Sequence, residues 1–197
     1  MLTSHNYNDT VLVLVGVEKA RFMIHTDTIC ARSEFFKAAC NEHWQEGQEM
    51  VVPLPDAQPE TFQMYMDLIF GSLAYDNESS SLPLIKYYVL SDFLGDVKSR
   101  NRAMQLLLST EQSKYPSTVS VDFIWKHTAP GCLLRKWAVD MIAAKLGPVH
   151  FARSITMYPA EFVQEIAMKL HRQAYPRLPH PSVNLQDYLE VDVEHDE

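Results

Sequence analysis

The apolar run VLVLV at residues 11–15 is the feature that most constrains the fold of this chain. Its β-branched residues favour an extended backbone, and an unbroken apolar run that stops at Gly16 predicts a strand buried on both faces. Residues 21–25 then alternate, with Phe22 and Ile24 on one side. Two such segments joined by a short turn predict a β-hairpin.

A third strand is predicted at residues 50–54, and Pro53 places it at a sheet edge because proline has no N–H to donate to a further strand. Beyond this strand the apolar residues recur at helical spacing. Helices are predicted over residues 59–71, 84–95 and 97–108. The residues expected on their apolar faces are Phe62, Met66, Ile69 and Phe70 in the first, and Ile85, Tyr88, Val89 and Phe93 in the second.

The second half of the chain also has helical spacing. Two faces are expected to pack into a core, one formed by Leu134, Trp137, Ala138, Met141 and Ile142, and the other by Phe162, Ile166 and Leu170. The sequence therefore predicts an α/β (α+β) fold. It consists of a small mixed sheet with helical hairpins, followed by an all-helical C-terminal extension.

The acidity of the chain is concentrated at its C-terminal end. The net charge is −8, but the segment from Val183 onward holds six acids and no Lys or Arg, and without them 19 acids face 17 bases. An acidic chain is not expected to have nucleic acid as its main partner. The end segment is expected to be solvated and flexible, and a docking tail is the alternative.

Composition also indicates in which cellular compartment the chain is expected. The hydrophobic share of 47% is typical of a globular protein, and the longest apolar run, residues 11–17, is too short to span a bilayer, so no membrane contact is expected. The first ten residues lack a basic region followed by an apolar stretch, so no secretory signal is expected. Three widely spaced cysteines favour a reducing compartment, either cytoplasm or nucleus.

Residues 23–36, MIHTDTICARSEFF, bring together side-chain types that catalytic sites use, among them His25, Asp27, Cys30 and Ser33. Structural roles explain them better. His25 ends a strand, Ser33 can cap a helix through its hydroxyl, and Cys30 suits a small buried position. No catalytic residue is therefore predicted, and a hydrolase that uses His25 and Ser33 is a remote alternative.

No metal, cofactor or small-molecule substrate is predicted. The eight histidines include no H-x-x-x-H pair and no C-x-x-C neighbour, the spacings typical of metal sites. The sequence also has no Gly-rich phosphate loop and no G-x-S-x-G elbow. Trp125 and Trp137 are expected to lie in the core and not in a ligand cage.

The same stretch matches the pattern H-x-x-x-[LI]-x-x-x-S-x-x-F at His25, Ile29, Ser33 and Phe36. This pattern is the signature of the BTB/POZ domain, and the passage VVPLPDAQPETF resembles a later strand-to-helix region of that family. The resemblance implies the BTB/POZ fold. It also implies protein–protein contacts, self-association among them, without enzymatic activity.

The second half resembles the C-terminal half of fungal BTB-domain proteins. The residues that carry this resemblance are Trp125, Thr128, Leu134, Arg135, Val139 and Asp140. Three regions are therefore expected: a BTB/POZ domain at residues 1–110, a helical extension packed on it at 111–176, and the acidic, flexible tail at 177–197.

The loop expected at residues 41–50 carries a candidate partner-binding site. BTB proteins that recruit a cullin scaffold often present a hydrophobic residue, any residue and Glu in this loop, and Trp44, Gln45 and Glu46 match that pattern. Tryptophan is also enriched at interface hot spots. In the alternative, Trp44 folds back on the domain and Glu46 is merely solvated.

The predicted function is that of a non-enzymatic protein–protein interaction module which serves as a substrate adaptor for a cullin-type ubiquitin ligase. The alternative is an oligomerising scaffold or transcription-related regulator with no ligase link. No substrate-selecting domain is recognised in the sequence, so a substrate is expected to bind the helical half or the tail.

Overall fold

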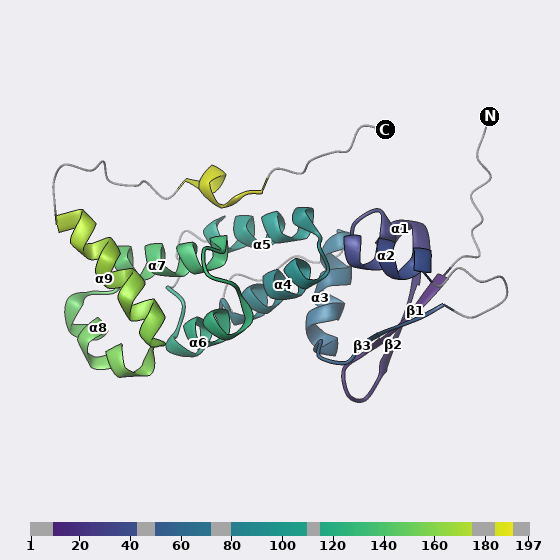
Figure 1. Cartoon of the computed structure of the whole chain (residues 1–197), viewed down its shortest axis with the longest axis horizontal. Helices are drawn as coiled ribbons and strands as arrows, with labels where there is room; N and C mark the ends of the chain where they lie inside the picture. The colour runs from purple at the N-terminus through teal and green to yellow at the C-terminus, as the bar shows by residue number, and fades with distance from the viewer. Residues whose placement is uncertain (1–9, 43–49, 72–79, 110–114, 175–183, 191–197) are drawn as a thin grey trace. The chain divides into compact units, whose positions relative to one another are not determined.

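The computed structural model describes residues 10–42, 50–71, 80–109, 115–174 and 184–190. Two strands are followed by two helices, a third strand and then, in the described residues, helices alone (Figure 1). The chain divides into two compact units: unit 1 comprises residues 1–74 and 90–99, and unit 2 comprises residues 75–89 and 100–197. The domain boundaries expected at residues 110 and 176 stay predictions.

Unit 1 contains a three-stranded mixed sheet with the strand order β2-β1-β3. Its strands are β1 (Thr10–Val15), β2 (Ala20–His25) and β3 (Val51–Leu54). β1 pairs with β2 in antiparallel fashion, as the predicted hairpin requires, and with β3 in parallel. The position of β3 at the edge confirms the prediction made from Pro53.

The central strand β1 is buried unequally on its two faces. Val11, Val13 and Val15 are fully buried, whereas Leu12 is only half-buried. Leu12 is paired with Met23, which is exposed. The predicted burial of this strand on both faces is therefore wrong for one face, because successive side chains alternate across the sheet and only one side is fully covered.

Helix α3 (Pro59–Ile69) covers part of the buried face. It begins at Pro59, where the missing N–H breaks no helical hydrogen bond. Phe62 is fully buried, and its ring packs edge-on against Phe22 of β2 with 4.9 Å between ring centroids. The same unit holds α1 (Thr26–Cys30) and α2 (Glu34–Glu42), and α4 (Leu82–Phe93) and α5 (Val97–Ser109) contribute residues to both units.

Two predicted core positions are wrong. Phe70 and Phe93 are 59% and 61% exposed. Each stands at the C-terminal end of its helix, where the backbone leaves the helical path and the spacing of 3.6 residues per turn no longer sets the direction of the side chain. Of the other positions expected on these faces, Phe62, Met66, Ile85 and Tyr88 are buried, whereas Ile69 and Val89 are half-buried.

Unit 2 is helical in its described residues. Its elements include α6 (Thr118–His127), α7 (Leu133–Lys145), α8 (Pro148–Ser154), η1 (Ile155–Met157), α9 (Ala160–Ala174) and η2 (Leu185–Tyr188). None of the helices in the described ranges is both long and apolar enough to cross a membrane.

The core of unit 2 lies where α6, α7 and α9 meet. Trp137 and Phe162 are fully buried, and the rings of Trp125 and Phe162 pack edge-on with 5.1 Å between centroids. The core positions predicted for Trp125 and Trp137 are thus confirmed. Leu170 is exposed and its predicted core position is wrong, because eight residues of helix turn it about 80° away from Phe162.

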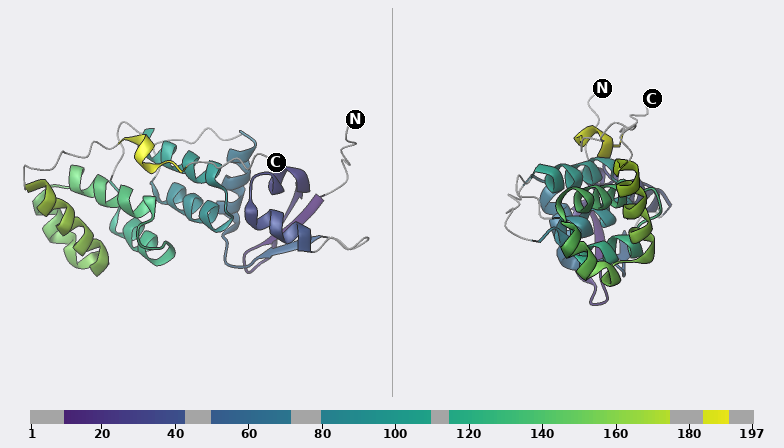
Figure 2. Two further views of the ribbon diagram at one scale, coloured as in Figure 1. Left: turned by 45° about the horizontal axis from the view of Figure 1, so that its top comes forward. Right: turned by 90° about the vertical axis from the view of Figure 1, so that its left-hand side faces the viewer.

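The acidic end segment differs from its expected solvated state. Within it, Tyr188 is only 1% exposed and its hydroxyl contacts Asp140 of α7, whereas Asn184 and Gln186 are exposed. Two views place η2 beside α5 and α7 (Figure 1, Figure 2). Residues 177–183 and 191–197 lie outside the described residues.

Candidate functional site

The four signature residues lie where β2, α1 and α2 follow one another in unit 1. Ile29, Ser33 and Phe36 are buried. His25 ends β2 as predicted, but its side chain is exposed and forms no cap hydrogen bond to α1. No hydrogen bond joins His25 to Ser33 among the described contacts, so the structure does not assemble the pair that the remote hydrolase alternative needs.

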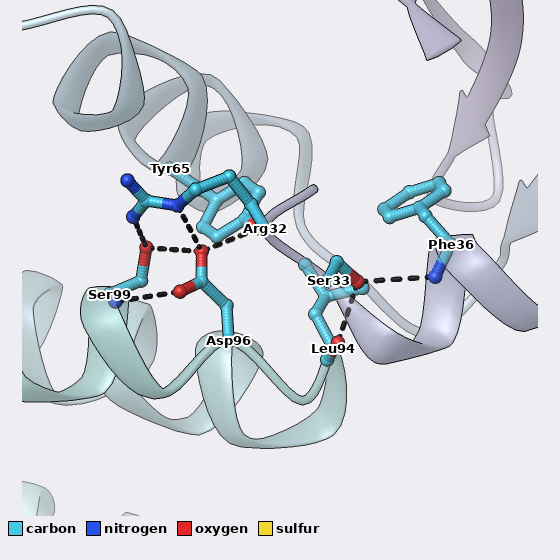
Figure 3. Close-up of polar contacts among 7 residues, drawn as sticks. All are labelled: Arg32, Ser33, Phe36, Tyr65, Leu94, Asp96 and Ser99. Carbon is cyan, nitrogen blue, oxygen red and sulfur yellow. Dashed lines mark hydrogen bonds and ion pairs between the residues drawn. The ribbon is translucent and has the colours of Figure 1, made fainter. Parts of the chain in front are cut away.

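The Ser33 hydroxyl is committed to two hydrogen bonds (Figure 3). It accepts from the backbone N–H of Phe36 at 3.2 Å and donates to the carbonyl oxygen of Leu94 at 2.6 Å. The first bond confirms the predicted helix cap, because it satisfies a free N–H in the first turn of α2. The second links the start of α2 to the end of α4, and it uses the single proton that a nucleophilic serine would have to release.

Ser33→Ala is expected to lower the free energy of unfolding by about 1–2 kcal/mol, because it removes the cap and one of the two hydrogen bonds that the Leu94 carbonyl accepts, the other coming from the N–H of Phe35. His25→Ala is the matched control, and its exposed side chain predicts a change within about 0.5 kcal/mol. Urea denaturation followed by circular dichroism measures both. Equal losses would contradict this difference, and a hydrolase activity abolished by either change at unaltered stability would revive the catalytic interpretation.

Asp96 is the centre of a buried polar network in unit 1 (Figure 3). The residue is 1% exposed. Its Oδ2 atom accepts hydrogen bonds from Arg32 Nε at 3.2 Å, the Tyr65 hydroxyl at 3.0 Å and the Ser99 hydroxyl at 2.7 Å, and Oδ1 accepts from the Ser99 N–H at 2.9 Å. Arg32 also donates to the Ser99 hydroxyl at 3.0 Å. One carboxylate thus joins the α1–α2 connection, α3 and the start of α5.

The turn before α5 positions this carboxylate. Gly95 has a φ of 67°, a left-handed conformation that side chains disfavour, and a Cβ there would lie 3.1 Å from the Cβ of Glu34. Asp96 then caps α5 through the N–H of Ser99. Asp96 was not predicted as a site residue, although Gly followed by Asp before a helical segment is a local signal of a helix start.

Cys30 and Cys40 are a pair of free thiols in the same region. The Cys30 Sγ atom lies 3.0 Å from Cys40 Sγ and 3.5 Å from the Phe36 carbonyl oxygen. Burial, reinforced by the hydrogen bond with Cys40, raises the pKa of Cys30 to about 12. The thiol therefore stays protonated at neutral pH, and a protonated thiol is a poor nucleophile.

Three of the residues that carry the resemblance to fungal proteins, Trp125, Thr128 and Arg135, are in contact with one another in unit 2. Arg135 is buried and donates to the carbonyl oxygens of Trp125 and Thr128 at 2.9 and 2.5 Å, and to the Thr128 hydroxyl at 3.1 Å. Its guanidinium carbon lies 5.0 Å from the Trp125 ring centroid, and one nitrogen lies 3.3 Å from Glu161. Arg135 of α7 therefore links this helix to the C-terminal end of α6.

The predicted partner-binding residues lie outside the described residues: Trp44, Gln45 and Glu46. The elements on either side are held by the core. Cys40 in the last turns of α2 is buried, and the carbonyl of Met50, just before β3, accepts from the N–H of Leu12 at 2.9 Å. Their assignment as a binding site stays a prediction.

An exposed aromatic residue near α2 was missed by the sequence analysis. Phe93 lies with its ring centroid 5.2 Å from that of Phe35, which is half-buried. Helical spacing assigned Phe93 to the core, so only the structure identifies it as surface. An exposed phenylalanine packed against a second one is a feature of protein-contact surfaces.

Two of the side chains that resembled catalytic groups, Ser33 and Cys30, make internal contacts instead. The described parts of the chain contain no group of three His, Cys, Asp or Glu side chains placed to hold a metal ion.

The comparison with protein families gives one match. The family model of the BTB/POZ domain matches residues 1–94, which include all four signature residues. The search of the curated proteins found no match to this chain. BTB/POZ domains are protein-interaction domains that also self-associate.

Proposed function

Because this chain carries a BTB/POZ domain, which is a protein–protein interaction module, we propose that it acts as a substrate adaptor for a cullin-type ubiquitin ligase. One surface of the chain binds the cullin scaffold and another binds the protein to be modified. The observation that carries this proposal is the sequence Trp44-Gln45-Glu46 between α2 and β3.

The flanks of this sequence support an anchoring role. The buried Cys40 on one side and the hydrogen-bonded Met50 on the other fix where the connection starts and ends. A segment with fixed ends has less conformational entropy to lose on docking than a free one. Tryptophan then supplies the large apolar contact, and Glu46 contributes orientation and encounter rate more than affinity.

The exposed ring of Phe93, packed on Phe35, also supports a protein-binding role for unit 1. Aromatic residues are enriched in interface cores. The chain's free cysteines, Cys30 and Cys40 among them, suit the reducing cytoplasm or nucleus, and we place the proposed adaptor there.

Trp44→Ala is expected to weaken binding to a purified cullin N-terminal region by about 2 kcal/mol, the size of a hot-spot loss, with the melting temperature unchanged. Isothermal titration calorimetry measures the affinity. Gln45→Ala is the matched control, because the pattern accepts any residue there, and it should change binding by no more than about 0.5 kcal/mol. Glu46→Lys should weaken binding in a salt-dependent manner.

Three results would count against the adaptor proposal. These are undetectable cullin binding at high micromolar concentration, a Trp44 fluorescence spectrum typical of a buried indole, or equal losses in the Trp44 and Gln45 variants. The oligomerising scaffold would then replace it. Sedimentation equilibrium would test that alternative through the dependence of mass on concentration.

A further inference from the structure

Residues 184–190 are seated on unit 2 in the manner of a bound peptide. Tyr188 is the anchor: its side chain is 1% exposed, and its hydroxyl donates to the carboxylate of Asp140 on α7, which Lys169 of α9 also contacts. The ammonium nitrogen of Lys136 lies 4.4 Å from the centroid of the Tyr188 ring. The aromatic ring is thus bound through its hydroxyl and its face.

Asn101 forms a second contact, with the backbone of the segment at Glu190. The side-chain amide of Asn101 donates to the carbonyl oxygen of Glu190 at 2.9 Å and accepts from the N–H of the same residue at 2.8 Å. The carboxylate of Glu190 pairs with the guanidinium of Arg100. Two hydrogen bonds from one amide fix the register of the peptide, and the two residues that it presents are spaced as Tyr-x-Glu.

Charge favours an acidic peptide at this position. Arg100, Lys136 and Lys169 contribute three cationic side chains to the contacts with residues 184–190 and Asp140. The sequence contains no Lys or Arg after Arg177. Attraction between a basic surface and an acidic segment raises the encounter rate and selects against basic peptides.

Few side chains of residues 184–190 anchor this segment to the rest of unit 2. Tyr188 is the fully buried side chain among those described in residues 184–190, and Glu190 remains partly exposed. Because the segment belongs to the same chain, its effective concentration is on the order of millimolar, and weak intrinsic affinity is enough to keep the site filled. A partner peptide presented at a comparable effective concentration therefore competes with it.

We propose that Arg100, Asn101, Lys136 and Asp140 form a recognition site for acidic Tyr-x-Glu segments of partner proteins. Residues 184–190 occupy this site as a tethered ligand. The site lies within unit 2 and does not depend on cullin binding. It gives the helical half a means of selecting proteins by an acidic, tyrosine-containing segment.

The test uses the full chain and a fluorescein-labelled synthetic peptide with the sequence of residues 184–197, followed by fluorescence anisotropy. Tyr188→Ala combined with Glu190→Lys empties the site, and this opened chain should bind the peptide at least about tenfold more tightly than the wild type. Adding Asn101→Ala to the opened chain should weaken binding at least about tenfold, because two hydrogen bonds are lost.

The matched control is Arg102→Ala in the opened chain, since Arg102 is exposed on the same helix, and it should change the affinity by no more than about twofold. A labelled peptide with alanine in place of its tyrosine should not bind. If the double change impairs folding, Glu190→Lys alone replaces it; because Tyr188 stays in place, a smaller gain in peptide binding over the wild type is expected.

The proposal is overturned if the opened chain takes up no peptide at concentrations up to about 1 mM. It is also overturned if the alanine-substituted peptide binds as well as the original, because the contact would then be charge alone. A wild-type dimer that the opened variant does not form would identify a second copy of the chain, and not a partner protein, as the source of the segment.

Discussion

Asp96→Ala is expected to lower the free energy of unfolding by about 3–5 kcal/mol, because it removes the hydrogen bonds that Arg32, Tyr65 and Ser99 donate to a buried carboxylate. Arg32 would keep a partly buried charge without its ion pair, and the Tyr65 hydroxyl would lose its contact with the carboxylate. The start of α5 would also lose its cap through Ser99. Urea denaturation followed by circular dichroism and intrinsic fluorescence measures the loss.

Two further variants make this result specific to the network. Asp96→Asn keeps an oxygen that can cap α5 but removes the charge, so a smaller loss than for alanine is expected. Glu60→Gln alters an exposed acid in the first turn of α3 and should change stability by no more than about 0.5 kcal/mol. If Asp96→Ala matched Glu60→Gln, the network would not stabilise unit 1.

Arg135→Ala should lower the free energy of unfolding by about 3 kcal/mol. It removes the donors to the buried Trp125 carbonyl and to two part-buried oxygens of Thr128, and it removes the guanidinium that packs on the Trp125 ring. Arg135→Lys should recover only part of this loss, because an ammonium group lacks the planar fork that reaches several acceptors at once. Thermal and urea unfolding measure this loss of stability. Tryptophan fluorescence is a suitable signal because Trp125 lies beside Arg135.

Glu161→Gln is the matched control for Arg135. It breaks the same ion pair from the side that is 70% exposed, so the change should stay within about 0.5 kcal/mol. The comparison separates the buried carbonyl contacts of Arg135 from its surface ion pair. A loss for Glu161→Gln as large as that for Arg135→Ala would assign the stabilisation to the ion pair instead.

Local chemistry explains the parts of the fold that were predicted correctly. The hairpin of β1 and β2, the edge position of β3 and the Ser33 cap follow from properties that act over a few residues: β-branching, the missing N–H of Pro53 and a hydroxyl next to a helix start. The signature His25, Ile29, Ser33 and Phe36 was readable for the same reason, since it lies within one short segment.

The wrong predictions concern residues at the ends of helices and residues on a sheet face that is only partly covered. Phe70 and Phe93 keep helical spacing but stand at helix ends, and both are exposed. Leu12 belongs to an apolar strand, yet the face it shares with Met23 is only partly covered. Spacing states which residues share a face of an element, whereas burial depends on what packs against that face.

The two proposed binding features also differ in whether the sequence alone could predict them. The pattern Trp44-Gln45-Glu46 is contiguous and was found from the sequence, and its role stays a prediction. The contacts of residues 184–190 could not be read in advance, because Asn101 and Glu190 are 89 positions apart and Tyr188 and Asp140 are 48 apart. Composition alone favoured a solvated tail. The acidity of the segment indicates that it is soluble, but it does not show that another part of the chain offers a basic surface to which the segment can bind.

Sequence alone was sufficient for the fold class, the strand order along the chain and the family signature, because propensity, periodicity and capping are short-range properties of the polypeptide. Only the tertiary structure shows that Asp96 lies among Arg32, Tyr65 and Ser99. The same holds for the acceptors around Arg135 and for the burial of Tyr188. The pairs Arg32–Asp96 and Tyr65–Asp96 are separated by 64 and 31 positions. A charged or polar side chain finds such partners only when the packing of distant helices brings them within hydrogen-bond distance and removes the water that would otherwise satisfy each group separately.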